Sequence, residues 1–125
     1  MKKLYTLSIC LLTFFAASAQ FVDDFESYTA GAYLAQSSSD WVTWSNSPGG
    51  SEDVKITTND AYSGDQSVYF SSTSATGGPV DVVLPFGSSV INTGQFTFSM
   101  WMKVESNKGA YFNFQGSPTI GQEWA

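Results

Sequence analysis

Five residues near the end of the chain have the types and spacing of a ligand-binding surface. They occupy alternate positions in two short segments, so in extended strands each set falls on one face. Aromatic rings pack against the C–H face of a sugar, while amide and amine groups hydrogen-bond its hydroxyls. The sequence therefore predicts a carbohydrate-binding surface formed by Trp101, Lys103, Tyr111, Asn113 and Gln115. The alternative is that a loop or further strands cover both aromatic rings, since large aromatic side chains are usually well buried.

A β-hairpin over residues 96–115 would place these side chains together. A five-residue loop, Glu105–Gly109, would pair Val104 with Ala110, set Lys103 opposite Tyr111 and bring Trp101 opposite Asn113. The opposite face of this predicted hairpin is apolar and would pack on a core; it consists of Phe96, Phe98, Met100, Met102, Val104, Phe112 and Phe114.

A second candidate site lies near the start of the mature chain. Asp24 and Glu26 are two residues apart, on one face of an expected strand, and hard cations such as Ca²⁺ bind several oxygens at once. These two residues are the candidate metal ligands, with structural Ca²⁺ as the candidate cofactor. The alternative is that both carboxylates only solvate an edge strand.

The residue inventory argues against catalysis. The chain has no His, and its one Cys, Cys10, lies in the N-terminal segment, which excludes Ser-His-Asp and Cys-His arrangements and the preferred ligands of zinc. Glycoside hydrolysis needs two facing carboxylates, but Glu52 and Asp53 are adjacent and point to opposite faces of a strand. We predict no catalytic residues.

The first 19 residues form a signal peptide. Lys2 and Lys3 precede a mostly apolar stretch, 4–15, which is too short to span a membrane, and Ala17-Ser18-Ala19 is a typical cleavage site. The expected domains are therefore 1–19, the signal peptide, and 20–125, the N-terminal part of one β-sandwich module. Cleavage after Ala19 removes Cys10, so no disulfide can form in the mature, secreted or cell-surface protein.

The charge of the chain limits its partners. The formal net charge is −6, and removal of Lys2 and Lys3 leaves three basic and eleven acidic residues, a net charge of −8. Binding to nucleic acid or to an anionic membrane surface requires clustered Lys and Arg, so both are excluded as partners.

Short alternating segments separated by Gly, Ser, Asn and Pro predict an all-β fold, an antiparallel β-sandwich of the jelly-roll type. No helical periodicity is evident after residue 20. Residues 119–125 begin another strand, so the module is expected to be incomplete at its C-terminus. The strands are expected at 22–26, 41–44, 53–58, 67–73 and 79–86. Val54, Ile56, Val68 and Phe70 are expected to face inward, and the last strand is expected to place Val80, Val82, Leu84 and Phe86 on one face.

Three segments resemble a known family. Asp24-Phe25-Glu26, the stretch Ala61–Phe70 with its aromatic-Ser-Gly-x-x-Ser-aliphatic pattern, and Phe96–Val104 resemble the concanavalin A-like, carbohydrate-binding jelly-roll modules of surface proteins exported by the type IX secretion route. The resemblance covers the N-terminal portion of such a module only. It implies a structural Ca²⁺ held by Glu26, Asp24 and backbone near Ser63.

Together these observations predict a secreted, non-catalytic, lectin-like module of a larger exported protein, with a glycan or cell-surface polysaccharide as partner. Two alternatives stay open. One is an adhesion module that binds protein; the other is the N-terminal fragment of a concanavalin-like glycoside hydrolase whose catalytic residues lie beyond Ala125.

Overall fold

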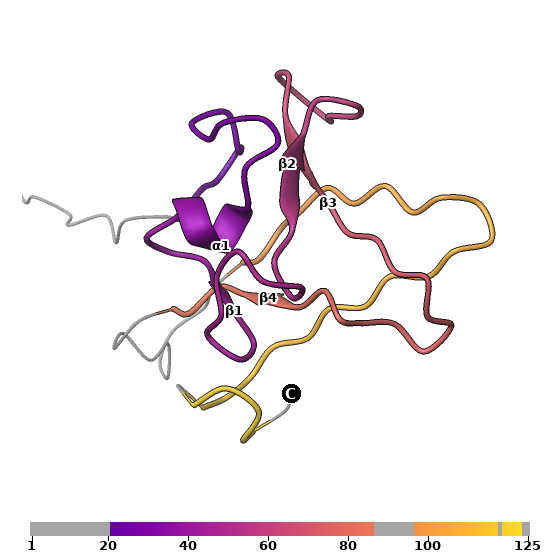
Figure 1. The fold of residues 1–125 in the computed structure, drawn as a ribbon. Coiled ribbons are helices and arrows are strands. Elements are labelled where there is room, and N and C mark those ends of the chain that lie inside the picture. Colours follow the sequence, from indigo (N-terminus) through magenta and orange to yellow (C-terminus); the bar gives the residue numbers. More distant parts are fainter. Residues whose placement is uncertain (1–20, 87–96, 118, 124–125) are drawn as a thin grey trace, which may run out of the picture.

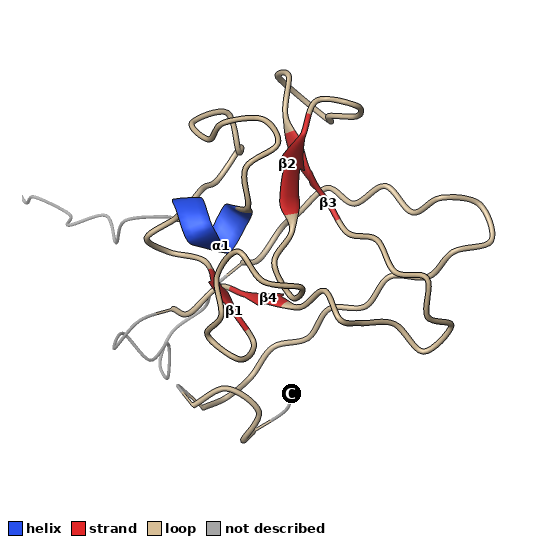
Figure 2. Cartoon of the chain, viewed as in Figure 1, coloured by secondary structure: helices blue, strands red, loops and turns tan. Residues whose placement is uncertain are grey.

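The structure, a computed structural model, describes residues 21–86, 97–117 and 119–123. The expected signal peptide, Phe96 and the last two residues lie outside these ranges. The described part is mostly non-helical and has a few antiparallel strands in two small sheets (Figures 1 and 2). The elements are α1 (Leu34–Ser37), β1 (Val42–Thr43), β2 (Lys55–Thr57), β3 (Ser67–Tyr69) and β4 (Val82–Val83).

The first sheet pairs β2 with β3, with Ile56 opposite Val68 at its centre. The chain just before α1 runs along the other edge of β2: the Ile56 N–H donates to the Ala32 carbonyl at 3.0 Å, and the Leu34 N–H donates to the Val54 carbonyl at 2.8 Å. Gly31, in the left-handed region with φ +85°, lets the chain turn into this pairing. The backbone around β2 is therefore hydrogen-bonded on both edges.

The second sheet joins residues far apart in sequence. β1 pairs antiparallel with β4, with Val42 opposite Val83 and Thr43 opposite Val82. The Trp44 N–H donates to the Asp81 carbonyl at 3.1 Å and extends this pairing by one residue. Residues 79–86 are thereby brought back to the N-terminal part of the fold.

The core is small and lies between α1 and β2. Leu34, Val54 and Ile56 are each at most 2% exposed, and the alternation along residues 53–58 predicted the burial of Val54 and Ile56. Partly buried side chains pack around these three: Phe25, Tyr28, Trp41, Val68, Val80 and Val82.

A buried carboxylate organises the backbone around this core. Asp53 is 5% exposed. One of its oxygens accepts the Ala35 and Val54 N–H groups at 2.9 and 2.8 Å, and the other accepts those of Gln36 and Gly49 at 3.1 and 2.9 Å. Ala35 and Gln36 belong to the first turn of α1, whose N–H groups have no partner within the helix. Asp53 therefore stabilises the short helix from a distant segment.

Several expected strands are present, but two details of the prediction are wrong. The strands at 41–44, 53–58, 67–73 and 79–86 each contain an observed strand, shorter than expected. Phe70, expected to face inward, is 55% exposed because β3 ends at Tyr69. Phe86, expected on the same face as Val82, is 49% exposed whereas Val82 packs against the core, because β4 ends at Val83. The one-turn helix α1 was also not expected.

The first expected strand, 22–26, is instead a turn. Phe25 has φ +64°, and the Phe25 and Glu26 N–H groups bond to the side chains of Asp23 and Asp24 at 2.9 and 3.1 Å. Asp side chains that bond to nearby backbone N–H groups compete with strand pairing, and here they replace it.

The hairpin over 96–115 is only partly formed. Its turn is present where expected, since the Lys108 N–H donates to the Glu105 carbonyl at 3.1 Å and Asn107 takes φ +61°. In the described residues 97–114, however, no strand is formed. A two-stranded ribbon is only marginally stable without a covering layer, and the apolar side chains of this ribbon are largely exposed: Phe98, Met100, Met102, Val104 and Phe112.

Candidate functional site

Trp101 and Lys103 meet a loop that lies about forty residues earlier in the chain. The Trp101 ring stacks on the Tyr62 ring, with centroids 3.8 Å apart and an interplanar angle of 11°. Next to this pair, Lys103 Nζ donates to both carboxylate oxygens of Asp60 at 2.8 Å. We call these four residues, Asp60, Tyr62, Trp101 and Lys103, the aromatic–ionic patch.

The loop that carries Asp60 and Tyr62 is held in place from the N-terminal segment. Glu26 Oε1 accepts the N–H groups of Asp65 and Gln66 at 2.9 and 2.8 Å, and the Gln66 side-chain amide donates to the Glu26 carbonyl at 3.2 Å. Gly64 sits against this carboxylate with φ +67°, and a Cβ there would lie 2.4 Å from Glu26 Oε1. Position 64 therefore requires Gly, because other residues disfavour this positive φ and a side chain would overlap the Glu26 carboxylate.

The patch is exposed and almost neutral. Trp101 and Tyr62 are 74% and 66% exposed. The hydrogen bond from Lys103 to Asp60, with the attraction of the Asp60 charge, raises the pKa of the Lys103 ammonium, so this cation stays charged and paired. Because both side chains of the ion pair are solvated, the pair contributes little to stability. Its role is to set two opposite charges beside the rings.

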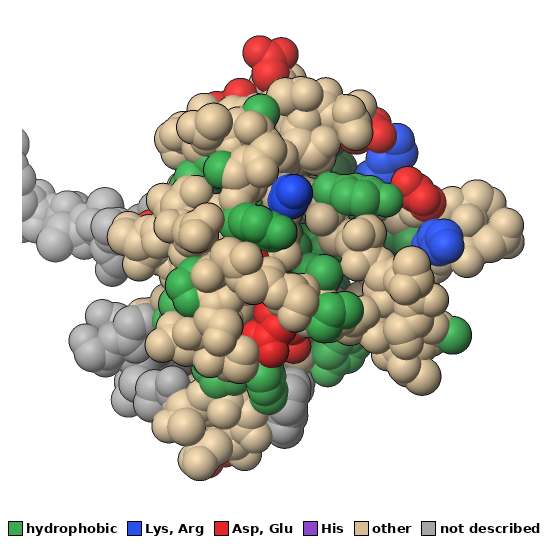
Figure 3. Space-filling model, in the orientation of Figure 1, with side chains coloured by type: hydrophobic (Ala, Val, Ile, Leu, Met, Phe, Trp, Pro, Cys, Tyr) green, Lys and Arg blue, Asp and Glu red, His purple; other side chains and the backbone are tan. Residues whose placement is uncertain are grey.

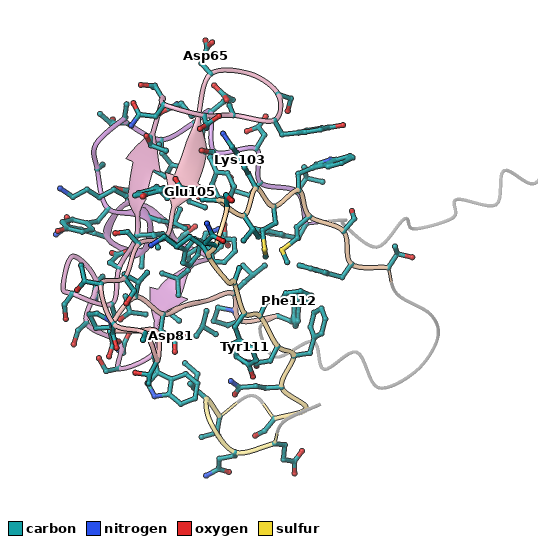
Figure 4. All side chains as sticks on the ribbon, turned by 90° about the vertical axis from the view of Figure 1, so that its right-hand side faces the viewer. Asp65, Asp81, Lys103, Glu105, Tyr111 and Phe112 are labelled. Atoms are coloured by element: carbon teal, nitrogen blue, oxygen red, sulfur yellow. The ribbon has the colours of Figure 1, made fainter. Side chains whose placement is uncertain are left out.

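The other three predicted sugar-binding residues do not join this patch. Tyr111 is 80% exposed and Asn113 is half-buried. Gln115 is also half-buried, and its side-chain oxygen accepts the Gly121 N–H at 2.6 Å. In Figure 4, Lys103 lies toward Asp65 and Tyr111 lies well away from it, toward Asp81. The expected juxtaposition of Lys103 and Tyr111 is therefore not observed.

The candidate metal ligands are used differently from what the resemblance implies. Glu26 does reach the loop near Ser63, but it faces N–H donors rather than the carbonyl oxygens that Ca²⁺ binds. Asp24 is exposed, and its side chain accepts the Glu26 N–H. Within the described residues, no group of three or more His, Cys, Asp or Glu side chains could hold a metal ion. Structural calcium therefore stays a prediction of the sequence.

A second pair of carboxylates lies beside the β1–β4 sheet. Hydrogen bonds from the Ser45 N–H and hydroxyl, each 2.8 Å from Glu52 Oε2, lower the pKa of Glu52. The pKa of Asp81 is raised, first because its carboxylate is partly desolvated and then because the Glu52 charge repels its own. The pKa shifts of both carboxylates therefore follow from local hydrogen bonds, burial and their mutual repulsion.

Sequence reasoning found two members of the aromatic–ionic patch and missed the other two. Asp60 and Tyr62 lie in an irregular loop without periodicity, so no pattern indicated where their side chains would point. The one available signal was the Tyr-Ser-Gly-Asp sequence of that loop, in which Gly64 permits a sharp turn.

Exposed apolar side chains form a second surface. Phe98, Phe112 and Phe114 contact one another, with ring centroids 5.0–6.3 Å apart. Together with Met100 they border a wide, open hollow that is lined mostly by residues within 57–86 and 97–117. The loop between β3 and β4 and the segment 97–117 extend away from the sheets in Figure 1. Figure 3 shows hydrophobic side chains distributed over one face of the molecule among polar atoms.

Comparison of the chain with models of known protein families, with characterised proteins and with solved structures found no match. Across the described ranges, no helix has the length and apolar character needed to cross a membrane.

Proposed function

We propose that this chain is a secreted, non-catalytic carbohydrate-binding module built on a β-sandwich of the jelly-roll type. Two separate antiparallel sheets, β1–β4 and β2–β3, support this proposal, because a sandwich consists of two antiparallel sheets. The N-terminal signal sequence supports export. The module would attach a larger exported protein to a glycan.

One observation carries the proposal: Trp101 is 74% exposed and yet lies flat on a neighbouring ring. A large aromatic side chain left in water forgoes the free energy of burial, about 2 kcal/mol or more. Stacking on Tyr62 fixes the ring orientation before any ligand arrives, so little side-chain entropy remains to be lost on binding. An exposed, pre-oriented ring beside polar groups is the arrangement that sugar recognition requires.

The patch would bind a sugar by two kinds of contact. The C–H groups on one face of a pyranose ring would pack on the outer face of Trp101, which removes apolar surface from water. The Asp60 carboxylate would accept hydrogen bonds from sugar hydroxyls, and the Lys103 ammonium would donate to them. Such contacts bind and orient a glycan without breaking a bond.

A second candidate function is supported by the exposed apolar surface. Phe98, Met100 and Phe112 are each at least 43% exposed and border the open hollow. Contiguous apolar surface on a folded protein often marks a protein-binding site. An adhesion module that binds a protein partner would use this surface and would not need the aromatic–ionic patch.

The two candidates are separated by one pair of variants. Trp101→Ala should abolish retention of the chain in gels that contain polysaccharide and its binding to a glycan array, with unchanged far-ultraviolet circular dichroism. The matched control is Phe86→Ala, which removes an aromatic ring that is 49% exposed and lies outside the patch. Glycan binding that survives Trp101→Ala, or binding to protein partners alone, would refute the proposal.

A further inference from the structure

The stacked rings of the patch restrict how a ligand can bind. The Tyr62 and Trp101 centroids are 3.8 Å apart, which is van der Waals contact, so no sugar can enter between them. A ligand must use the outer faces and the edges of the pair. Tyr62 then acts both as the support of the Trp101 ring and as a second exposed platform, at 66% exposure.

The charges of the patch restrict the ligand class. Lys103 is the cation of the patch, and both of its bonds at 2.8 Å go to the Asp60 carboxylate. A uronate or a sulfate bound to Lys103 would lie beside the Asp60 carboxylate, and the two negative charges would repel each other. The mature chain, with three basic and eleven acidic residues, would add long-range repulsion. A neutral sugar meets neither obstacle, since its hydroxyls can bond to Asp60 and Lys103 while the two stay paired.

We therefore infer that the ligand is an uncharged glycan and that Asp60 and Tyr62 bind it together with Trp101 and Lys103. This inference rests on the proposed carbohydrate-binding function and deepens it. Glu26 is a positioning residue in this site, because it holds the loop that carries Asp60 and Tyr62 through the N–H groups of residues 65 and 66.

The ligand class can be tested by isothermal titration of the full secreted chain with two sets of oligosaccharides. The neutral probes are the hexasaccharides of cellulose, xylan, mannan and laminarin; the anionic probes are hexagalacturonate and hexamannuronate. Titrations at ionic strengths of about 0.02 M and about 0.15 M vary the screening of the chain's charge. We expect at least one neutral probe to bind with an affinity that salt does not change, and neither anionic probe to bind at either salt.

The binding residues can be tested with the best neutral probe. Tyr62→Ala should lower the affinity by about tenfold, because it removes one platform and frees the Trp101 ring. Asp60→Asn should also weaken binding, because it removes the negative charge that pairs with Lys103 and replaces one of the two acceptor oxygens with an NH₂ group. The matched control is Tyr69→Ala, an exposed tyrosine on β3 outside the patch, which should bind as the unaltered chain does.

The outcomes separate this inference from the proposed function. Anionic probes that bind more tightly than neutral ones, with affinity that falls as salt rises, would refute the neutral ligand and leave carbohydrate binding intact. Neutral probes that bind Tyr62→Ala and Asp60→Asn at full affinity would refute the assigned residues. Absence of binding to every probe would refute the proposed function and this inference with it.

Discussion

Replacement of Asp53 by Asn tests the claim that one buried carboxylate organises the fold. The four backbone N–H groups that bond to Asp53 come from three segments: α1, the turn that contains Gly49, and Val54 just before β2. An Asn side chain has the same size but only one oxygen acceptor, and its NH₂ group would face two N–H donors. Two of the four donors therefore lose their partner.

The expected loss of stability follows from these two donors. Each buried N–H left without an acceptor costs about 1–3 kcal/mol, and the N–H groups of Gln36 and Gly49, which share one oxygen, are only partly buried. We expect Asp53→Asn to lower the free energy of unfolding by about 3 kcal/mol. That is a large fraction of the 5–15 kcal/mol typical of a domain, and it corresponds to a fall in Tm of at least about 10 °C for a chain of this size.

Urea unfolding followed by tryptophan fluorescence measures this change, since Trp41 packs against the core and reports its loss. The matched control is Asp65→Asn, which removes the same charge from an exposed side chain and should change stability by less than about 0.5 kcal/mol. If both variants unfold at the same urea concentration with the same slope, the Asp53 carboxylate does not organise the fold as we argue.

Two further variants test local features of the structure. Gly64→Ala should destabilise the chain more than Gly77→Ala in the same unfolding assay. Both glycines have positive φ, but an added Cβ would meet the Glu26 carboxylate at Gly64 and open space at Gly77. Equal effects of the two substitutions would contradict the close approach of Gly64 to Glu26. Glu52→Gln should lower the pKa of Asp81, measured by carboxyl NMR titration, yet leave it above its usual value because desolvation, the larger cause, remains; an unchanged or higher pKa would contradict the repulsion. The hydrogen bonds to Glu52 lower the pKa of its carboxyl group in the folded chain, so they stabilise the fold at pH values above the ordinary pKa of 4.5. This contribution is lost as the pH falls through the lower pKa of the folded state. The unaltered chain should therefore lose more stability on acidification than Glu52→Gln.

The regular elements were the most predictable part of the fold. Alternation along 53–58 correctly placed Val54 and Ile56 in the core, because a half-buried strand must put alternate residues on one side. The same reasoning failed at Phe70 and Phe86, where the strands end early and the periodic rule no longer applies. It also failed at 22–26, where two Asp side chains bond to the backbone.

The candidate site was predictable only in part. Trp101 and Lys103 stood out by residue type and spacing, whereas Tyr111 and Gln115 satisfied the same pattern and lie outside the patch. The predicted grouping depended on a ladder between two strands that the described residues do not form. A pattern within one segment shows which residues could share a face; it contains no information on which distant loop that face meets.

The sequence by itself determined the acidic charge and the absence of His, and it predicted the antiparallel β character of the chain. Each of these depends on residue type or on local periodicity, which are properties of the chain before it folds. Only the tertiary structure decided that Asp53 is buried among backbone N–H groups and that Tyr62 and Asp60 meet Trp101 and Lys103. The contacts of the aromatic–ionic patch join residues up to 43 positions apart, and Glu26 and the β2–β3 pairing fix the path of the loop that makes them.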